Sequence, residues 1–229
     1  ALTKTGTGTW TLTGASTYTG STTVSAGTLQ MGAGGSLGSA NYSSSLSIAS
    51  GSTFNWVSNQ SQTFSTITGA GTLNLNGTAQ TVTLSGTQAF TGTLNIAQAV
   101  SVLGGANTSV SGLGNAAVIN INTGGTLSLT GGDNSFLGYG SQVASASVTP
   151  VVINTGGTLT TPGNSSFHIG GLTLAGGELA APSDTACCGT FNLDRTVSVT
   201  ANSTISAAGV VLTQTGGTTL DRNSTRLNS

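Results

Sequence analysis

Carboxylates are the residues with which this chain could do acid–base chemistry. A glycosidase needs two of them a few ångströms apart, one as the acid and one as the nucleophile or base. In a coiled chain, two acids share a face only when they lie about one coil apart or two residues apart within a strand. Glu178 and Asp194 are only loosely compatible with a short coil, and Asp184 and Asp194 are expected on different faces. Together with Asp133, these acids do not predict a catalytic pair, so we expect no enzyme.

The segment 178–195 concentrates charge in a chain that otherwise has little of it. A solvated loop with weak surface ion pairs is the favoured interpretation. A cation site is the alternative, but the Gly-Gly-x-Gly-x-Asp repeat of calcium-binding β-rolls is absent. We expect no metal and no cofactor. A neutral insertion is the favoured interpretation of this segment, and the hypothesis against it is that 178–195 protrudes as the recognition loop. Its candidate residues are Glu178, Asp184, Asp194 and Arg195.

The cysteine and histidine residues do not predict a metal site either. Cys187 and Cys188 are adjacent, and a disulfide between neighbours would close a small, strained ring, so two free thiols are expected. His168 stands alone and is expected to face solvent from a short strand, which leaves no ligand set for zinc. No Gly-x-Ser-x-Gly turn supports a serine nucleophile.

Low charge limits the partners that the chain can bind. Charged residues make up 4% of the sequence and the formal net charge is −1. Nucleic-acid binding needs a basic patch, which this composition does not supply, so no nucleic acid is expected. No apolar run approaches the ~20 residues of a membrane helix, so we expect no membrane insertion by this segment. A secretion signal is expected upstream of Ala1.

A Gly-Thr-apolar marker recurs through the chain, and apolar residues two apart flank polar ones after it. That period of two is typical of half-buried strands, and no stretch shows the helical period. We predict an all-β fold, a right-handed parallel β-helix (a solenoid) with about 20 residues per coil. A β-sandwich would not explain why Asn74 and Asn95 recur at one position, where a stacked ladder is expected. Markers begin at Gly8, Gly27, Gly71, Gly92, Gly125, Gly157 and Gly189.

This register predicts which side chains fill the core, because neighbours in a strand face opposite sides. Trp10, Phe54 and Trp56 are predicted to fill the core rather than stack on carbohydrate, while Tyr18 is expected to be the most exposed aromatic residue. Predicted inward residues are Leu73, Leu75, Leu94, Ile96, Leu127 and Leu129, and predicted outward residues are Thr72, Asn74, Thr126 and Ser128.

Two intervals interrupt the repeat. Residues 97–124 and 130–156 hold turn-forming clusters and are either extended loops or irregular coils. Within them, 131–147 is a second candidate for recognition. The last nine residues lack any alternation and resemble an adaptor-derived tail. We therefore divide the chain into a β-helical segment, 1–220, and a non-native tail, 221–229.

The first thirty-one residues form the clearest repeat unit. They contain, in order, Leu2-Thr3-Lys4-Thr5-Gly6, Gly8-Thr9-Trp10-Thr11-Leu12, Thr17-Tyr18-Thr19-Gly20, Thr22-Thr23-Val24 and Ala26-Gly27-Thr28-Leu29. This order resembles the autotransporter-associated β-strand repeat of type V passenger domains. The resemblance is strict over 1–31 and continues as Gly-Thr-Leu echoes to about 193.

The resemblance implies a passenger segment of an autotransporter that is secreted or displayed on the bacterial cell surface. It would act as a structural stalk or adhesin without catalysis. The resemblance also implies a C-terminal β-barrel translocator elsewhere in a larger protein, which would anchor the segment to the outer membrane. Partners would be a host or neighbouring-cell surface or a glycan. A carbohydrate-active β-helix enzyme and a trimeric fibre or spike protein are the alternatives.

Overall fold

The computed structural model describes residues 1–78, 81–86, 88–103, 113, 116–130, 149–160, 166–169, 171–181, 190–193, 197–207 and 210–211. In this part of the chain, every regular element is a β-strand except the single 3₁₀ turn η1 (Gly38–Ala40). The predicted tail 221–229, the predicted loop 131–147 and the paired cysteines lie outside the described residues, so those predictions stay open.

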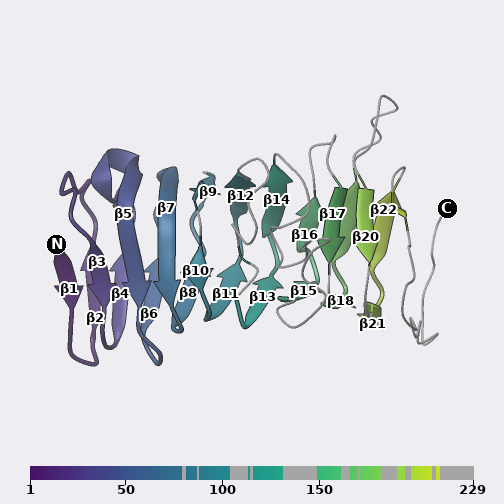
Figure 1. Ribbon diagram of the computed structural model, residues 1–229, viewed down its shortest axis with the longest axis horizontal. Coiled ribbons are helices and arrows are strands. Elements are labelled where there is room, and N and C mark those ends of the chain that lie inside the picture. Colours follow the sequence, from purple (N-terminus) through teal and green to yellow (C-terminus); the bar gives the residue numbers. More distant parts are fainter. Residues whose placement is uncertain are drawn as a thin grey trace.

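Parallel strands stack side by side along the rod in Figure 1. The first ladder contains β1 (Leu2–Lys4), β3 (Thr22–Val24), β5 (Asn41–Ile48), β7 (Gln62–Gly69), β9 (Val82–Leu84), β10 (Ala89–Phe90), β12 (Ala99–Leu103), β14 (Thr126–Thr130), β16 (Thr158–Thr160), β19 (Glu178–Ala181) and β22 (Thr204–Ala207). The second contains β2 (Thr9–Leu12), β4 (Thr28–Met31), β6 (Thr53–Trp56), β8 (Thr72–Leu75), β11 (Thr93–Ile96), β13 (Val118–Ile121), β15 (Pro150–Asn154), β18 (Gly171–Ala175) and β21 (Val197–Ala201). The third contains β17 (Ser166–Ile169), β20 (Thr190–Leu193) and β23 (Val210–Val211).

The prediction of a parallel β-helix is confirmed. Strands pair between successive coils, and a coil takes about 21 residues. In the second ladder, Leu73 pairs with Phe54 on one side and with Leu94 on the other. Like residues therefore stack on like residues, which is the physical reason why the markers recur in the sequence.

The predicted faces are also confirmed. All six predicted inward residues are fully buried, whereas Thr72, Asn74, Thr126 and Ser128 are half-buried on the outside. The inward side chains of successive coils form one continuous core along the rod. Since a slip of one residue would turn the leucines outward, burial of apolar area fixes the register.

The glycine of the Gly-Thr-apolar marker is required by close stacking of the coils. A Cβ built on Gly92 would overlap the backbone of Gly71, and one built on Gly125 would overlap the carbonyl of Ile96. These glycines therefore serve the close approach of neighbouring backbones.

Two long strands, β5 and β7, each contribute to two stretches of the first ladder. Tyr42 of β5 pairs with Phe64 of β7, and Phe64 pairs onward with Leu84. Four residues further along β5, Leu46 pairs with Ile67 of β7 and also back with Thr22 in β3. A register shift between Tyr42 and Ser45 separates the two parts, so β5 bends around a corner of the coil.

The described parts of the two long intervals contain strands of the stack. Strands β12 and β13 lie inside 97–124, and β15 lies inside 130–156. The register of the second ladder continues across them, since Ile119 pairs with Leu94 before it and with Val151 after it. Extra length between strands is accommodated without breaking the stack, as expected if the apolar columns set the register.

The prediction that Trp10 fills the core is wrong. Trp10 occupies the same column as Leu29 and Phe54, but its side chain is 44% exposed. Leu12 beside it is only partly buried. The reason is that β2 is the first strand of its ladder, so coil packing covers its inner face on one side only. Phe54 and Trp56, each between two coils, are fully buried as predicted.

Candidate functional site

The candidate recognition residues are not assembled into one site by the described part of the chain. Glu178 begins β19 and pairs with Thr158 and Thr204, so it lies within the stack. Its carboxylate accepts a hydrogen bond from the Ser206 hydroxyl. Asp184, Asp194 and Arg195 lie outside the described residues.

The prediction that the whole segment 178–195 protrudes needs correction. Residues 178–181 form β19 and residues 190–193 form β20, and each pairs in parallel with a strand of a neighbouring coil. Both ends of the segment are therefore part of the solenoid, and a recognition loop would have to lie between them.

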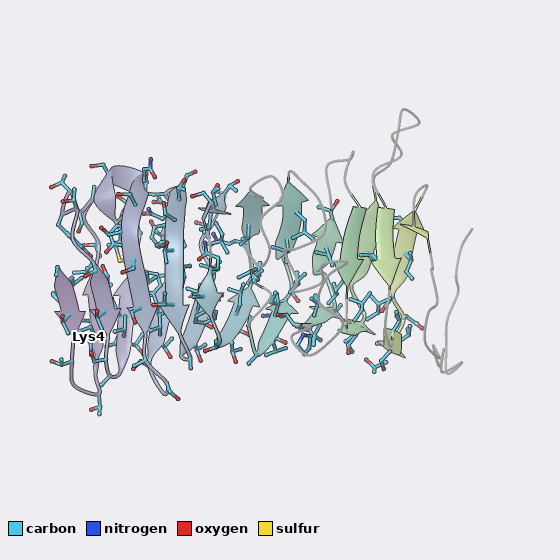
Figure 2. The ribbon with its side chains drawn as sticks, viewed as in Figure 1. Lys4 is labelled. Carbon is cyan, nitrogen blue, oxygen red and sulfur yellow. The ribbon has the colours of Figure 1, made fainter. Side chains whose placement is uncertain are left out.

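The N-terminal repeat carries the most specialised contacts. Lys4 ends β1, and its buried ammonium donates hydrogen bonds to three backbone carbonyls, those of Thr5 at 2.9 Å, Gly6 at 2.7 Å and Ala26 at 3.1 Å. Figure 2 labels this side chain near the N-terminal end of the rod. A single charged side chain thereby folds the turn after β1 and ties it to the turn of the next coil. Such charge-assisted bonds compensate the cost of burying the ammonium.

Gly27 completes this connection. Its φ is +65°, a conformation that other residues rarely adopt, and a Cβ at this position would overlap the turn formed by Gly6, Thr7 and Gly8. The glycine thus lets the second turn lie directly on the first. Thr28, the next residue, donates its backbone N–H to the carbonyl of Gly8 at 3.2 Å.

Two tyrosines and a threonine form a hydroxyl chain across three segments of the fold. The Thr22 hydroxyl lies 2.7 Å from the Tyr18 hydroxyl and 2.7 Å from the Tyr42 hydroxyl. Tyr42 also donates to the carbonyl of Gly20 at 2.6 Å. Tyr18 is half-buried, so the prediction that it is the most exposed aromatic residue is wrong, and among the aromatic residues whose burial is described Trp10 is the most exposed.

Burial changes the acidity of both tyrosines. Desolvation raises the pKa of Tyr18, and its hydrogen bond with Thr22 partly offsets the rise. Desolvation is also the main cause of the raised pKa of Tyr42, and nearby Tyr18 adds to it, while the hydrogen bonds with Thr22 lower it. Both hydroxyls are therefore protonated at neutral pH and available as hydrogen-bond donors.

An aromatic cluster continues from these tyrosines into the core. Tyr42 packs edge-to-face on Tyr18 and on Phe64, with ring centroids 6.2 Å and 6.4 Å apart. Phe64 packs in the same way on Phe54 at 6.0 Å and on Trp56 at 5.8 Å. The cluster joins successive coils of the N-terminal part through rings of favourable geometry.

The outer face of the second ladder carries an ordered array of amides. Asn95 donates to the side-chain carbonyl of Asn74 at 2.8 Å, and Asn120 donates to that of Asn95 at 2.8 Å. Asn55 donates to Gln30 at 2.7 Å. The predicted stacking of Asn74 and Asn95 is confirmed. We call the whole column the amide ladder; it contains Gln30, Asn55, Asn74, Asn95 and Asn120.

A second column runs beside the amide ladder, two residues away along each strand. We call it the threonine column; it contains Thr9, Thr28, Thr53, Thr72 and Thr93. Thr9 is exposed and the others are half-buried, so their hydroxyl and methyl groups form part of the surface. The two columns together make a regular polar face over β2, β4, β6, β8, β11 and β13.

These arrangements are suited to binding and to structure more than to acid–base chemistry. Within the described residues, no group of three His, Cys, Asp or Glu side chains could hold a metal ion. The same part of the chain contains no helix that is both long and apolar enough to cross a membrane. Among the described residues, the polar side chains with hydrogen bonds are mainly amides and hydroxyls, together with the buried Lys4 and the Glu178 carboxylate.

A known family model matches the N-terminal part of the chain. Residues 2–31 match the family model of the passenger-associated-transport-repeat. The match covers β1 to β4, including Lys4, Tyr18, Thr22 and Gly27. No curated protein and no solved structure matches the chain.

Sequence reasoning found the Asn74–Asn95 pair but not the full extent of the polar face. The available signal was the pattern Thr-apolar-amide-apolar, which stands at 28–31, 53–56, 72–75 and 93–96. The Gly-Thr-apolar marker ends one residue before the amide, so it did not reveal the full amide column. No sequence pattern indicated the hydrogen-bond partners of Lys4, because one of them, the Ala26 carbonyl, belongs to the following coil.

Proposed function

We propose, on the premise that residues 2–31 are a passenger-associated-transport repeat, that this chain is a structural and adhesive passenger segment without catalysis. It forms a rod that is exported and displayed on a bacterial surface or released. The observation that carries the proposal is that residues within the matched segment hold one coil against the next. Lys4 bonds across to Ala26, and Gly27 makes room for the turn at Gly6.

The rest of the described chain supports a stalk. One apolar core runs along the coils, and each coil contacts its neighbours through parallel pairing. Solenoids of this kind grow in length by adding coils and present long faces to their surroundings. Length and surface, rather than an enclosed cavity, are what such a rod offers an exported protein.

The partners of the segment follow from this role. We propose that it contacts a host or neighbouring-cell surface or a glycan, and that a translocator domain of the same larger protein exports it and anchors it to the outer membrane. The residues Glu178, Asp184, Asp194 and Arg195 remain a candidate recognition segment. Charged groups on a rod with so few charges would dominate the local field there.

Surface display is the direct test. Intact cells that produce the full-length protein should bind antibodies raised against this chain, and external protease should remove the signal. Signal that appears only after lysis would contradict display. Adhesion of these cells to host cells and to one another should fall when the chain is deleted. Release of reducing or unsaturated sugar ends from neutral or acidic polysaccharides by the purified chain would contradict a role without catalysis.

A further inference from the structure

We infer that the polar face formed by the threonine column and the amide ladder binds a neutral, polyhydroxylated polysaccharide, as extended chains or as an ordered surface. The inference rests on the proposed adhesive function and assigns that function to one face of the rod.

Asn95 of the amide ladder is pre-oriented for such a ligand by its hydrogen bonds to the coils on both sides. Asn95 uses one N–H toward Asn74 and accepts one hydrogen bond from Asn120. A primary amide has two N–H donors and two acceptor lone pairs, so these bonds leave Asn95 one donor and one lone pair for a ligand. Because the neighbouring coils already hold the amide in place, binding costs little side-chain entropy.

The face repeats with the spacing of the sheet. Adjacent strands lie about 4.8 Å apart, and the two columns lie about 6.6 Å apart along each strand. A polymer that carries hydroxyl groups at regular intervals can therefore make the same contact in several coils. Individually weak hydrogen bonds gain strength when many of them act together on one ligand.

Charge selects among the polymers. Strands β2, β4, β6, β8, β11 and β13 contain no Asp, Glu, Lys or Arg. Nucleic acids and acidic polysaccharides are bound through basic groups, which this face lacks. Protein interfaces depend on Trp, Tyr and Arg anchors in pockets, and the outward positions of these strands hold only Thr, Asn, Gln and Val. A neutral polymer rich in hydroxyl groups is the ligand class that remains.

The test uses the purified chain and three solid or immobilised polymers, namely microcrystalline cellulose, chitin and heparin–agarose. The double variant Thr72→Lys, Thr93→Lys places two long cations on the face while leaving the amide ladder in place. The matched control, Thr83→Lys, Ser128→Lys, makes the same change at half-buried outward positions of the first ladder. Circular dichroism and the denaturation midpoint establish that each variant is folded.

We expect the wild-type chain to sediment with cellulose or chitin and not to be retained by heparin. The face variant should bind roughly tenfold more weakly, and the control should stay within about twofold of wild type. Thr72→Val, Thr93→Val, which removes only the two hydroxyl groups, should weaken binding less and serves if the lysine variant does not fold.

Three results would overturn the inference: no retention on cellulose or chitin, equal losses in the face variant and the control, or stronger retention on heparin. Partition of the chain into growing ice without binding to either polysaccharide would assign the face to a different ordered solid and would also overturn it. None of these results affects antibody labelling of intact cells, so the proposed display on the cell surface is tested separately.

Discussion

The N-terminal coils and the later coils share one geometry but are stabilised differently. Up to β9, the core contains Tyr42, Phe54, Trp56 and Phe64. Buried polar side chains also hydrogen-bond to backbone groups at the corners of these coils. Gln62 is an example, since its side chain accepts a hydrogen bond from the Leu37 N–H at 2.8 Å and donates to the Leu37 carbonyl at 3.1 Å. Leu37 lies outside the strands, so the Gln62 side-chain amide, and not the backbone of a neighbouring strand, bonds to its N–H and carbonyl groups.

In the described part of the chain after β9, the buried apolar side chains are aliphatic except for Phe90, and Gln88, Gln98 and Thr149 are buried polar residues. The buried apolar residues of this part are Phe90, Leu94, Ile96, Val100, Leu113, Ala116, Ile119, Ile121, Leu127, Leu129, Val151, Ile153, Leu159, Leu172, Leu174, Leu179 and Val197. The stack nevertheless keeps the same parallel register there as in the N-terminal coils. Aliphatic columns are therefore sufficient for the coil geometry. The cluster of Tyr42, Phe54, Trp56 and Phe64 adds ring contacts to the coils up to β9.

The largest effect is expected at the centre of the aromatic cluster. Phe64→Ala should lower the free energy of unfolding by about 4 kcal/mol, because it removes a ring that touches Tyr42, Phe54 and Trp56 and leaves a cavity. Denaturant titration of the purified chain measures the change. A loss below about 1 kcal/mol would mean that the cluster does not distinguish the N-terminal coils.

An aliphatic column should be less sensitive to truncation than the aromatic cluster. Leu127→Ala should cost about 3 kcal/mol through lost burial and a smaller cavity. Its neighbour Ser128 points outward, so Ser128→Ala should change stability by less than about 0.5 kcal/mol. Equal shifts of the two denaturation midpoints would contradict the register.

The lysine that joins the first two turns should have a local effect. Lys4→Met keeps much of the apolar stem but leaves three carbonyls without their donor, at a cost of about 2 kcal/mol. Because coils contact only their neighbours, faster hydrogen exchange should be confined to the first coils. The N–H groups of Ser25 and Thr28, which bond to Lys4 and Gly8, report it. Equal acceleration in β13 would show that the effect is global.

The tyrosines predict how stability depends on alkaline pH. Because their pKa values are raised in the folded state, the folded chain holds these protons more tightly than the unfolded chain does. Their contribution is complete below about pH 10, the ordinary tyrosine pKa, and is lost as the pH rises through the folded-state values. Denaturation midpoints measured from pH 8 to 11.5 should therefore fall at the alkaline end. The double variant Tyr18→Phe, Tyr42→Phe should show a shallower fall, whereas an unchanged slope would assign it to other groups.

The smallest change in stability is expected in the charged segment. Asp184→Asn with Arg195→Gln should alter stability by less than about 0.5 kcal/mol if these charges serve recognition rather than folding. Binding of the purified double variant to host cells and to bacterial cells measures the recognition role. Undiminished binding would remove this segment from consideration and leave the polar face as the candidate surface.

The sequence by itself determined the period, the inward columns and the stacking of Asn74 on Asn95. These properties are readable because a parallel solenoid places like positions of successive coils in contact, so a tertiary contact appears as a repeat in the sequence. The Gly-Thr-apolar marker was readable for the same reason, since a Cβ would overlap the preceding coil at the marker glycines Gly27, Gly71, Gly92, Gly125 and Gly157.

Tertiary structure alone decided what depends on position within the stack. Trp10 and Phe54 occupy the same column, but only Phe54 has a coil on both sides, so one is exposed and the other buried. Glu178 looked like the start of a charged loop, yet it follows the outward register of β19 and lies among its strand partners. Lys4 donates hydrogen bonds to carbonyls of two coils, those of Gly6 and Ala26, and no local sequence pattern indicates that these groups are neighbours. The repeat predicts the strands and the inward positions of each coil, whereas contacts with neighbouring coils decide which side chains are buried and which hydrogen bonds they make.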